Sequence, residues 1–138
     1  KSITRTANES EFLSGKKTIM VATSAFGMGI DLDSVDLVVH FNMPLLFTDY
    51  LQQSGRAGRN GQKAHAVLLY SDEDYYTNLE ILHNGHPTLR GMEQLDMMRE
   101  FCDDNKHCMA QLLMEHFGQK MKKSCKHCTV CQKNRRKK

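Results

Sequence analysis

The chain has 138 residues, of which 40% are hydrophobic and 25% are charged, a composition typical of one water-soluble globular domain or two small ones. No apolar run is long enough to span a membrane and no secretory signal pattern is present, which argues against membrane-embedded and secreted classes. The net charge is only +3, but residues 106–138 carry ten basic side chains and one acidic one, a distribution expected of a nucleic-acid contact.

The first 71 residues predict alternating helices and strands. A short helix should end near Gly15, and the run rich in β-branched residues at 18–23 predicts a buried strand. Further strands are predicted at 35–41 and 64–70, each a compact apolar segment bounded by turn residues. This alternation indicates an α/β fold with a parallel sheet.

Two loops in this region carry residue types that are common at ligand sites. The first follows the predicted strand at 18–23 and ends at Asp31, on the sheet edge where α/β proteins bind ligands. A plain turn acid is the alternative interpretation of Asp31. The second loop ends a helix that Thr48 can cap, and from Gln52 to Gly61 it reads Gln-Gln-Ser-Gly-Arg-Ala-Gly-Arg-Asn-Gly.

Arg56 and Arg59 lie three residues apart in the second loop, so a helical turn would place both on one face. The neighbouring glycines allow the backbone to approach itself or a ligand closely. A guanidinium is permanently charged and matches phosphate oxygens two at a time, which suits a clamp on a phosphoryl group in its transition state. A basic surface loop with turn glycines is the alternative interpretation.

From Ser71 onward the composition changes and predicts helices. Ser71 can cap a first helix with an acidic opening turn, Thr88 can cap a second, and Gly118 should end a third that begins near Cys108. The apolar residues that recur at helical spacing in the first two are Tyr75, Leu79, Leu82, Met92, Leu95, Met98 and Phe101. Such a methionine-containing stripe could bind peptides, but a core between helices is the favoured interpretation.

The five cysteines are odd in number, and three of them fall within seven residues. This pattern argues against a secreted disulfide framework and favours metal ligation in a reducing compartment. Four thiolates from a helix start and a tight loop can complete a tetrahedral zinc shell, and the predicted ligands are Cys108, Cys125, Cys128 and Cys131. Nearby lysines would favour the ionised thiols.

Two alternatives to this ligand set stay open. An iron–sulfur cluster uses a similar C-x2-C-x2-C run, although the further Cys-Pro of the bacterial signature is absent. His107 or His127 could replace a cysteine, but each is adjacent to a predicted ligand, where simultaneous ligation is awkward. Cys102 is interpreted as a thiol of the helical core.

Two stretches, Ala22 to Asp31 and Gln52 to Gly61, resemble the fifth and sixth motifs of superfamily 2 helicases in the form found in RecQ-family DNA helicases. The Ala-Phe-Gly-Met-Gly-Ile run is similar to RecQ, as is Gln52, where DEAD-box RNA helicases usually carry His-Arg. The cysteine spacing resembles the RecQ zinc-binding subdomain. The resemblance implies a partial RecA-like lobe with a parallel sheet at 1–71, followed by a small helical zinc-binding subdomain with a basic tail at 72–138.

That resemblance implies an ATP-dependent DNA helicase that moves 3′ to 5′ on single-stranded DNA and unwinds duplex DNA in repair or recombination. Arg59 and Arg56 would meet the ATP phosphates. The residues implied on the nucleotide side are Gly29, Asp31 and Gln52, and those implied at DNA are Thr23, Lys122, Lys123 and Lys126. For the last six residues a solvated tail is the simpler interpretation. An intracellular location is expected, nuclear in a eukaryote.

The sequence contains neither a G-x-x-x-x-G-K-S/T phosphate loop nor an Asp-Glu-Ala-His type acidic box. Without them an arginine clamp has no bound phosphate or Mg²⁺ to act on, so we expect no ATP hydrolysis by this chain alone. ATP and Mg²⁺ would be held by the first RecA-like lobe of the same parent protein. The alternative is a non-catalytic, zinc-containing nucleic-acid-binding module derived from a helicase.

Overall fold

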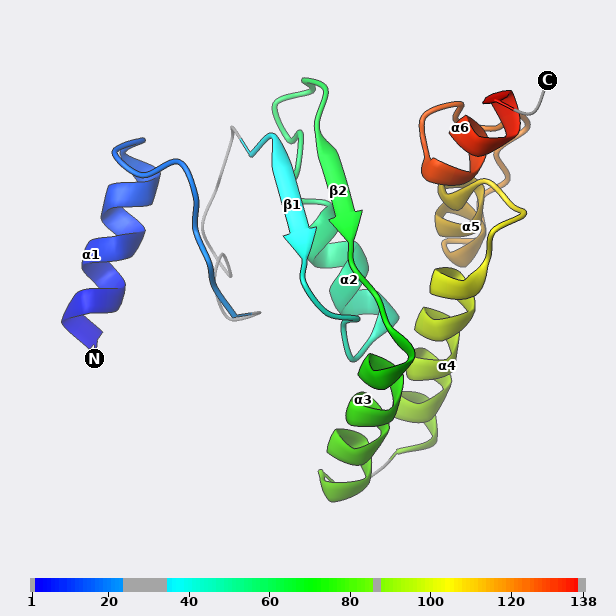
Figure 1. Cartoon of the computed structure of the whole chain (residues 1–138), viewed down its shortest axis with the longest axis horizontal. Coiled ribbons are helices and arrows are strands. Elements are labelled where there is room, and N and C mark those ends of the chain that lie inside the picture. Colours follow the sequence, from blue (N-terminus) through cyan, green and yellow to red (C-terminus); the bar gives the residue numbers. More distant parts are fainter. Residues whose placement is uncertain (1, 24–34, 86–87, 137–138) are drawn as a thin grey trace. The chain divides into compact units, whose positions relative to one another are not determined.

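The computed structural model describes residues 2–23, 35–85 and 88–136 (Figure 1). Within these ranges the elements are α1 (Ser2–Leu13), β1 (Leu37–His40), α2 (Phe47–Ser54), β2 (His65–Leu68), α3 (Asp72–Asn84), α4 (Leu89–Asp103), α5 (Met109–His116) and α6 (Thr129–Arg136). The chain divides into two compact units, unit 1 (Lys1–Val38 and Gln53–Ala66) and unit 2 (Val39–Gln52 and Val67–Lys138). No helix in the described ranges has both the length and the apolar content to cross a bilayer.

Strands β1 and β2 pair with each other in parallel, as the alternating pattern predicts. The His65 amide donates to the Asp36 carbonyl at 2.8 Å, and four residues further along both strands the Leu69 amide donates to the His40 carbonyl at 2.9 Å. This constant offset is the register of parallel strands, and the two arrows run in the same direction in Figure 1. The predicted strands at 35–41 and 64–70 are therefore confirmed.

The predicted strand at 18–23 is wrong. These residues have no regular secondary structure, and the side chains of Ile19 and Val21 are 80% and 93% exposed. A strand needs a neighbour to pair with, and the sheet of the described residues contains β1 and β2 only. The run at 18–23 therefore has the composition of a buried strand, but its apolar side chains Ile19 and Val21 are exposed.

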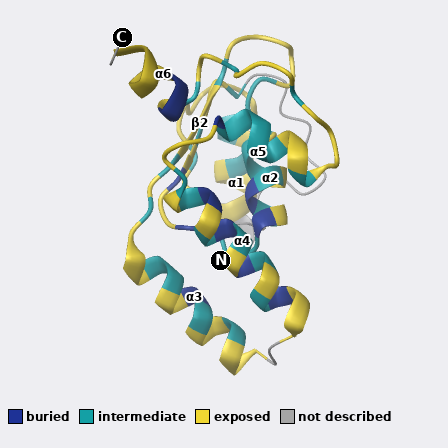
Figure 2. Cartoon of the chain, turned by 90° about the vertical axis from the view of Figure 1, so that its right-hand side faces the viewer, coloured by how far each residue is buried: buried dark blue, intermediate teal, exposed yellow. Residues whose placement is uncertain are grey.

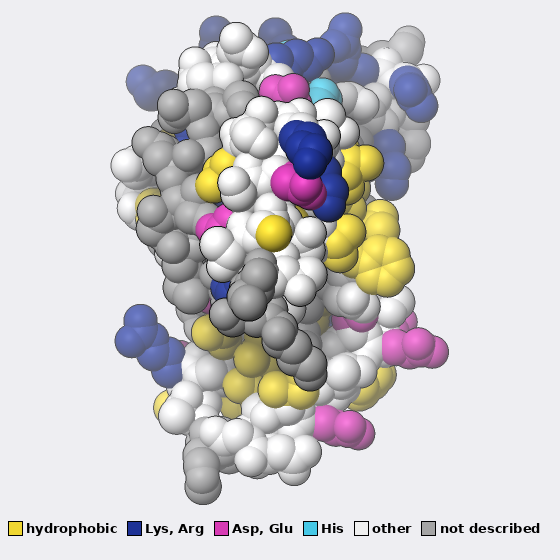
Figure 3. Space-filling model, turned by 90° about the vertical axis from the view of Figure 1, so that its left-hand side faces the viewer, with side chains coloured by type: hydrophobic (Ala, Val, Ile, Leu, Met, Phe, Trp, Pro, Cys, Tyr) yellow, Lys and Arg dark blue, Asp and Glu magenta, His cyan; other side chains and the backbone are white. Residues whose placement is uncertain are grey.

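Unit 1 has no buried residue in its described part, although several of its side chains are partly covered. Helix α1 ends before Gly15, which has a left-handed backbone conformation with φ of 75°, so the predicted end of this helix is confirmed. Lys16 and Lys17 then each form an ion pair with the Glu11 carboxylate at 2.7 Å. Figure 3 shows hydrophobic side chains at the surface of the face that it draws.

Unit 2 holds the hydrophobic core, whose members come from the segment before and within α2 and from α4 (Figure 2). Its buried members are Met43, Phe47, Tyr50, Leu95, Met98 and Phe101. The rings of Phe47 and Phe101 meet edge to face with centroids 5.4 Å apart, a favoured geometry for aromatic pairs. The apolar stripe of α4 is thus core, as predicted, rather than a peptide-binding surface.

Helix starts in unit 2 follow local capping rules. The Thr88 hydroxyl accepts the Gly91 amide at 3.0 Å, which confirms the predicted cap of α4. The Asp74 carboxylate accepts the Ser71 amide at 3.0 Å and the Asn42 side chain at 2.7 Å, so it joins the start of α3 to the end of β1. Thr48 does not cap α2, because the helix already begins at Phe47 and Thr48 lies in its first turn.

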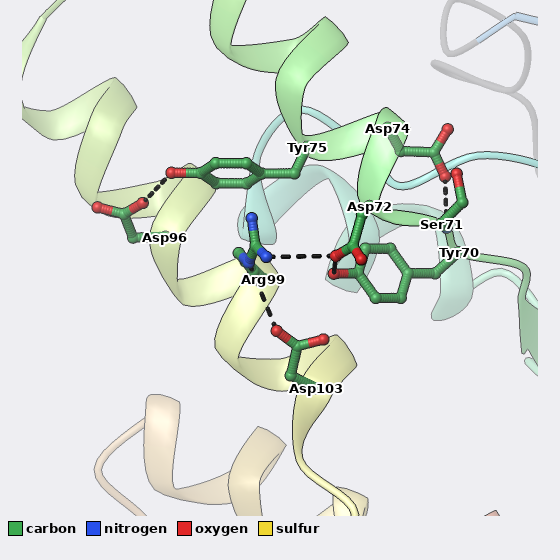
Figure 4. A network of polar contacts seen from close by, with 8 residues as sticks. All are labelled: Tyr70, Ser71, Asp72, Asp74, Tyr75, Asp96, Arg99 and Asp103. Atoms are coloured by element: carbon green, nitrogen blue, oxygen red, sulfur yellow. Dashed lines mark hydrogen bonds and ion pairs between the residues drawn. The ribbon is translucent and has the colours of Figure 1, made fainter.

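A charged network joins α3 and α4 around Arg99 (Figure 4). The Arg99 guanidinium lies 4.3 Å from the centre of the Tyr75 ring and pairs with Asp72 at 3.2 Å and Asp103 at 3.5 Å. The Tyr75 hydroxyl donates to Asp96 at 3.0 Å. One cation thus offsets part of the acidic charge of residues 72–105, which carry nine acidic side chains and two basic ones.

Candidate metal centre and arginine turn

The arginine turn, which carries Arg56 and Arg59, follows α2 directly. The two side chains are therefore presented from a helix end, as expected. Backbone hydrogen bonds from Arg56 to the Gln53 carbonyl and from Ala57 to the Ser54 carbonyl, both 3.2 Å, continue the last turn of α2. Arg56 is half-buried and Arg59 is exposed. The two guanidiniums therefore stand on an ordered turn rather than on an extended loop.

Gly58 is the residue that lets this turn close. Its φ is 72°, and a Cβ atom placed there would lie 2.9 Å from the Gln62 carbonyl oxygen and 3.1 Å from the Ala64 side chain. Its amide donates to the Val35 carbonyl at 3.0 Å, next to β1. Only glycine combines this left-handed conformation with so close a backbone approach. Gly58 is therefore the glycine that allows the close approach expected in this turn.

The remaining residues predicted on the nucleotide and DNA sides are placed unequally. Gly29 and Asp31 lie outside the described residues. Thr23 is exposed and has no regular secondary structure, and Gln52 is exposed on α2. All three lysines that are predicted to contact DNA are exposed: Lys122, Lys123 and Lys126.

Four thiols converge between α5 and α6. The Sγ atoms of Cys108, Cys125, Cys128 and Cys131 all lie within 4.8 Å of one another. A Zn–S bond of about 2.3 Å in a tetrahedral shell sets the sulfurs roughly 3.8 Å apart, and the Cys125 and Cys131 sulfurs are separated by 4.0 Å. The donor set therefore fits a tetrahedral zinc ion after a small contraction.

The loop between Cys125 and Cys128 is built around its sulfur atoms. The amides of His127 and Cys128 both point at the Cys125 sulfur, at 3.4 and 3.3 Å, and the Cys125 amide points at the Cys108 sulfur at 3.2 Å. Lys126 supplies the sharp reversal with a φ of 64°, in the left-handed region that non-glycine residues rarely adopt. These N–H groups lie where they stabilise negative charge on sulfur.

The pKa values of the clustered thiols are shifted in opposite directions. Burial alone would raise the pKa of Cys108, but hydrogen bonds from the amides of Cys125 and Gln111 outweigh it and lower that pKa to about 6. Burial, together with the hydrogen bond that the Cys131 thiol donates to the neighbouring Cys128 sulfur, raises the pKa of Cys131 to about 11. Four negative sulfurs at this spacing repel one another unless a cation lies between them.

The residues considered as alternative ligands lie elsewhere. The Nδ1 atom of His107 lies 2.7 Å from the Asp104 carboxylate, and the His127 ring is outside the four-thiol group. Cys102 packs against the helical core, where burial raises its pKa to about 12. Cys102 is half-buried against the core, which agrees with its interpretation as a thiol of the helical core.

Sequence reasoning missed helix α6, which carries Cys131 and the buried Val130. The Gln132 side chain donates to the His127 carbonyl at 2.7 Å and so fastens this helix to the cysteine loop. The segment has almost no apolar periodicity, since lysine, arginine, asparagine and glutamine follow Cys131. The available signal was the spacing of two residues between Cys128 and Cys131, which suits one turn at a helix start.

Two family models match the chain in tandem. The helicase conserved C-terminal domain matches residues 1–61, and the RecQ zinc-binding domain matches residues 72–132. The first is a RecA-like lobe, so the predicted fold class is confirmed. The parallel sheet, the arginine turn and the four-thiol centre therefore define a helicase C-terminal lobe joined to a zinc-binding module.

Curated relatives agree with these matches. The chain is 36% identical to the ATP-dependent DNA helicase hus2/rqh1 of Schizosaccharomyces pombe, over 89% of this chain and 10% of that protein. It is 32% identical to the ATP-dependent DNA helicase RecQ of Bacillus subtilis, over 92% of this chain and 22% of that protein. A putative ATP-dependent RNA helicase of Acanthamoeba polyphaga mimivirus is 31% identical, over 92% of this chain and 24% of that protein.

The chain belongs to the RecQ family of helicases. It spans no more than about a quarter of the length of these relatives. The match to the RecQ zinc-binding domain and the four-cysteine cluster together support a structural zinc ion.

Proposed function

We propose that this chain is part of an ATP-dependent DNA helicase that moves 3′ to 5′ along single-stranded DNA and separates duplexes. The observation that carries the proposal is the combination, in one chain, of an ordered arginine turn and a four-thiol centre that matches the RecQ zinc-binding domain. Two of the relatives described above are named as ATP-dependent DNA helicases. Residues 1–71 would serve the motor, and residues 72–138 would serve zinc and DNA binding.

In this proposal the arginine turn acts on the phosphates of ATP. Arg59 and Arg56 would stabilise the charge that develops on the transferred phosphoryl group. Gln52, Gly29 and Asp31 would lie on the nucleotide side. ATP and Mg²⁺ would be held chiefly by a first RecA-like lobe of the same parent protein, because the sequence contains no phosphate-binding loop.

The four cysteines would hold zinc as a structural crosslink. Zinc bound by four thiolates has no open coordination position and contributes folding free energy rather than chemistry. Cys108 would fix the start of α5, Cys125 and Cys128 the intervening loop, and Cys131 the first turn of α6.

DNA would be contacted through its phosphates without reading of the sequence. Thr23, Lys122, Lys123 and Lys126 are the proposed contacts, and all four are exposed. Each phosphate contact releases counterions and adds about 0.9 units on duplex DNA, or about 0.7 on a single strand, to the log–log dependence of affinity on salt. A helicase of this kind would serve DNA repair or recombination, in the nucleus if the source is a eukaryote.

The decisive experiment compares the longer protein with this chain alone. We expect the longer protein to hydrolyse ATP when single-stranded DNA is present and to unwind duplexes with a 3′ overhang, while duplexes with a 5′ overhang stay intact. This chain alone should bind single-stranded DNA and hydrolyse no ATP. A longer protein that binds DNA but neither hydrolyses ATP nor unwinds would instead support the non-catalytic nucleic-acid-binding module.

A further inference from the structure

A shallow apolar hollow of about 280 Å³ lies within unit 2 between α2 and the end of α5. Its lining residues are Thr48, Leu51, Gln52, His116 and Phe117. None of them belongs to the four-thiol centre, and four of the five are absent from the residues assigned to ATP or DNA. The rings of His116 and Phe117 and the Leu51 side chain provide the flat surface, and the polar groups are a hydroxyl, an amide and the imidazole nitrogens.

Phe117 is the exposed wall of this hollow. Its side chain is 63% exposed, and its ring centre lies 5.4 Å from that of His116 in an edge-to-face arrangement. His116 in turn packs edge to face on the buried Phe47, with ring centres 4.8 Å apart. The exposed ring therefore stands on a side chain that is held by the core.

The backbone at Phe117 is held by the hydrogen bonds that end α5. Gly118, with φ of 70°, ends α5, and its amide donates to the Glu115 carbonyl at 2.9 Å. The Gln119 amide reaches back to the Met114 carbonyl at 2.9 Å. This pair of bonds is the Schellman arrangement of a helix end, so the backbone that carries the ring is fixed before any ligand arrives.

The charge around the hollow favours a polyanion that carries flat apolar groups. Lys120, Lys122 and Lys123 follow Phe117 within six residues, and all three are exposed. The Gln111 side chain donates to the Met121 carbonyl at 3.0 Å, which holds this lysine segment against α5. Glu115 is the one acidic residue from 106 to 138. A basic peptide or a neutral apolar partner would not use these lysines.

We propose that this hollow is a stacking site for one unpaired base of single-stranded DNA, with Phe117 as the platform and the following lysines on the flanking phosphates. An aromatic ring beside a positively charged track is how proteins bind single strands without sequence preference, because every base has a flat face. The inference rests on the proposed function to the extent that DNA is the substrate. A bound base would also touch α2 at Gln52, on the helix that leads into the arginine turn.

The test uses the zinc-loaded chain and an oligothymidine that carries a single 2-aminopurine. Phe117→Ala should weaken binding about 5- to 150-fold, the range found for loss of one base–aromatic stack, and should abolish the change in 2-aminopurine fluorescence. Phe117→Trp should keep both. Leu89→Ala, which alters another exposed apolar residue of unit 2, is the matched control and should bind like the unaltered chain.

Salt dependence separates the ring from the lysines. Phe117→Ala should lower the affinity by the same factor at every salt concentration, whereas Lys122→Ala should lower the log–log slope by about 0.7 units, the value for one phosphate contact on a single strand. If the unaltered chain shows steep salt-dependent binding and Phe117→Ala matches it, the base site is wrong while the proposed function stands. If the unaltered chain binds no single-stranded DNA, both are wrong.

Two other outcomes would also overturn the base site. In the first, Phe117→Ala leaves the DNA affinity of this chain unchanged but lowers the melting temperature of the longer protein by several degrees. The ring would then be an internal packing residue. An RNA oligonucleotide of matching sequence that binds tenfold more tightly than the DNA would assign the hollow to RNA.

Discussion

The two compact units of this chain differ in how they bury their side chains. Among the described residues, every buried side chain lies in unit 2, and Leu95 and Met98 there have no exposed surface. Unit 1 leaves Ile19 and Val21 almost fully exposed. Apolar burial is the main favourable term in folding. Among the described residues, most of this stabilisation therefore comes from unit 2 and little of it from unit 1.

The candidate sites divide in the same way. The arginine turn lies in unit 1 and depends on backbone geometry around Gly58, whereas the four-thiol centre lies in unit 2 beside the core. A change in the first should therefore remove activity while the fold stays intact. A change in the second should remove the fold, and activity with it.

The largest effect should come from the metal ligands. We expect Cys108→Ser to lose zinc and to unfold unit 2, because structural zinc sites in peptides contribute about 10 kcal/mol or more near neutral pH. Cys102→Ser is the matched control and should keep zinc, with a cost of roughly 1–2 kcal/mol for a small buried substitution. Elemental analysis and thermal melting of both variants provide the measurement.

The same samples test the ligand set and the metal. Loss of zinc from Cys102→Ser with retention in Cys108→Ser would show that the fourth ligand is Cys102. The unaltered protein should be colourless, since zinc does not absorb visible light. A brown protein with visible absorption would instead indicate an iron–sulfur cluster.

Arg59→Ala, introduced into the longer protein, should lower DNA-stimulated ATP turnover about a thousandfold while nucleotide still binds. That factor corresponds to about 4 kcal/mol of transition-state stabilisation. The melting temperature should change little, because the buried core lies in unit 2 and Arg59 lies in unit 1. Arg90→Ala, another exposed arginine, is the control, and near-normal turnover by Arg59→Ala would remove this residue from the site.

Gly58→Ala should be more damaging than Gly61→Ala, although both glycines have φ above 70°. A Cβ at Gly61 meets nothing within 4 Å, so that variant carries only the cost of a left-handed alanine, about 1–2 kcal/mol. At Gly58 the clash with Gln62 adds roughly 1–3 kcal/mol. Hydrogen exchange of the His65 amide, which bonds to Asp36, reports the local loss, and equal effects of the two variants would contradict the close approach.

The smallest effect should be that of Thr88→Ala in unit 2. It removes the side-chain acceptor for the Gly91 amide at the start of α4, at a cost of about 1 kcal/mol. Thr77→Ala, on the exposed face of α3, is the control. Thermal melting should show a small shift for Thr88→Ala with the zinc content unchanged, and a shift as large as that of Cys108→Ser would mean that unit 2 has little stability beyond this cap.

Features that depend on a few neighbouring residues could be predicted from the sequence. Thr88 caps α4 and Gly118 ends α5 because capping uses atoms within a few residues. The four cysteines could be grouped because metal ligation requires particular side chains at close spacing. The strands around 37–40 and 65–68 could be predicted because each is apolar and bounded by turn residues.

The errors concern features that depend on distant partners. The run at 18–23 has the composition of a strand but no described neighbour to pair with. Helix α6 has almost no apolar pattern, and its first turn is fixed by the cysteine cluster instead. The left-handed conformation of Lys126 could not be predicted, because lysine rarely adopts it and it accompanies the amide hydrogen bonds of His127 and Cys128 to the Cys125 sulfur.

The composition of the core has a consequence for where this chain can be cut. Phe47 and Tyr50 precede the helical segment by more than twenty residues in the sequence, yet they fill the space against Phe101. A shortened polypeptide that began at residue 72 would retain every cysteine and still present an open apolar cavity. Limited proteolysis of the intact chain should therefore leave the piece with α2 associated with the piece that holds zinc, even after the link near residue 61 is cleaved.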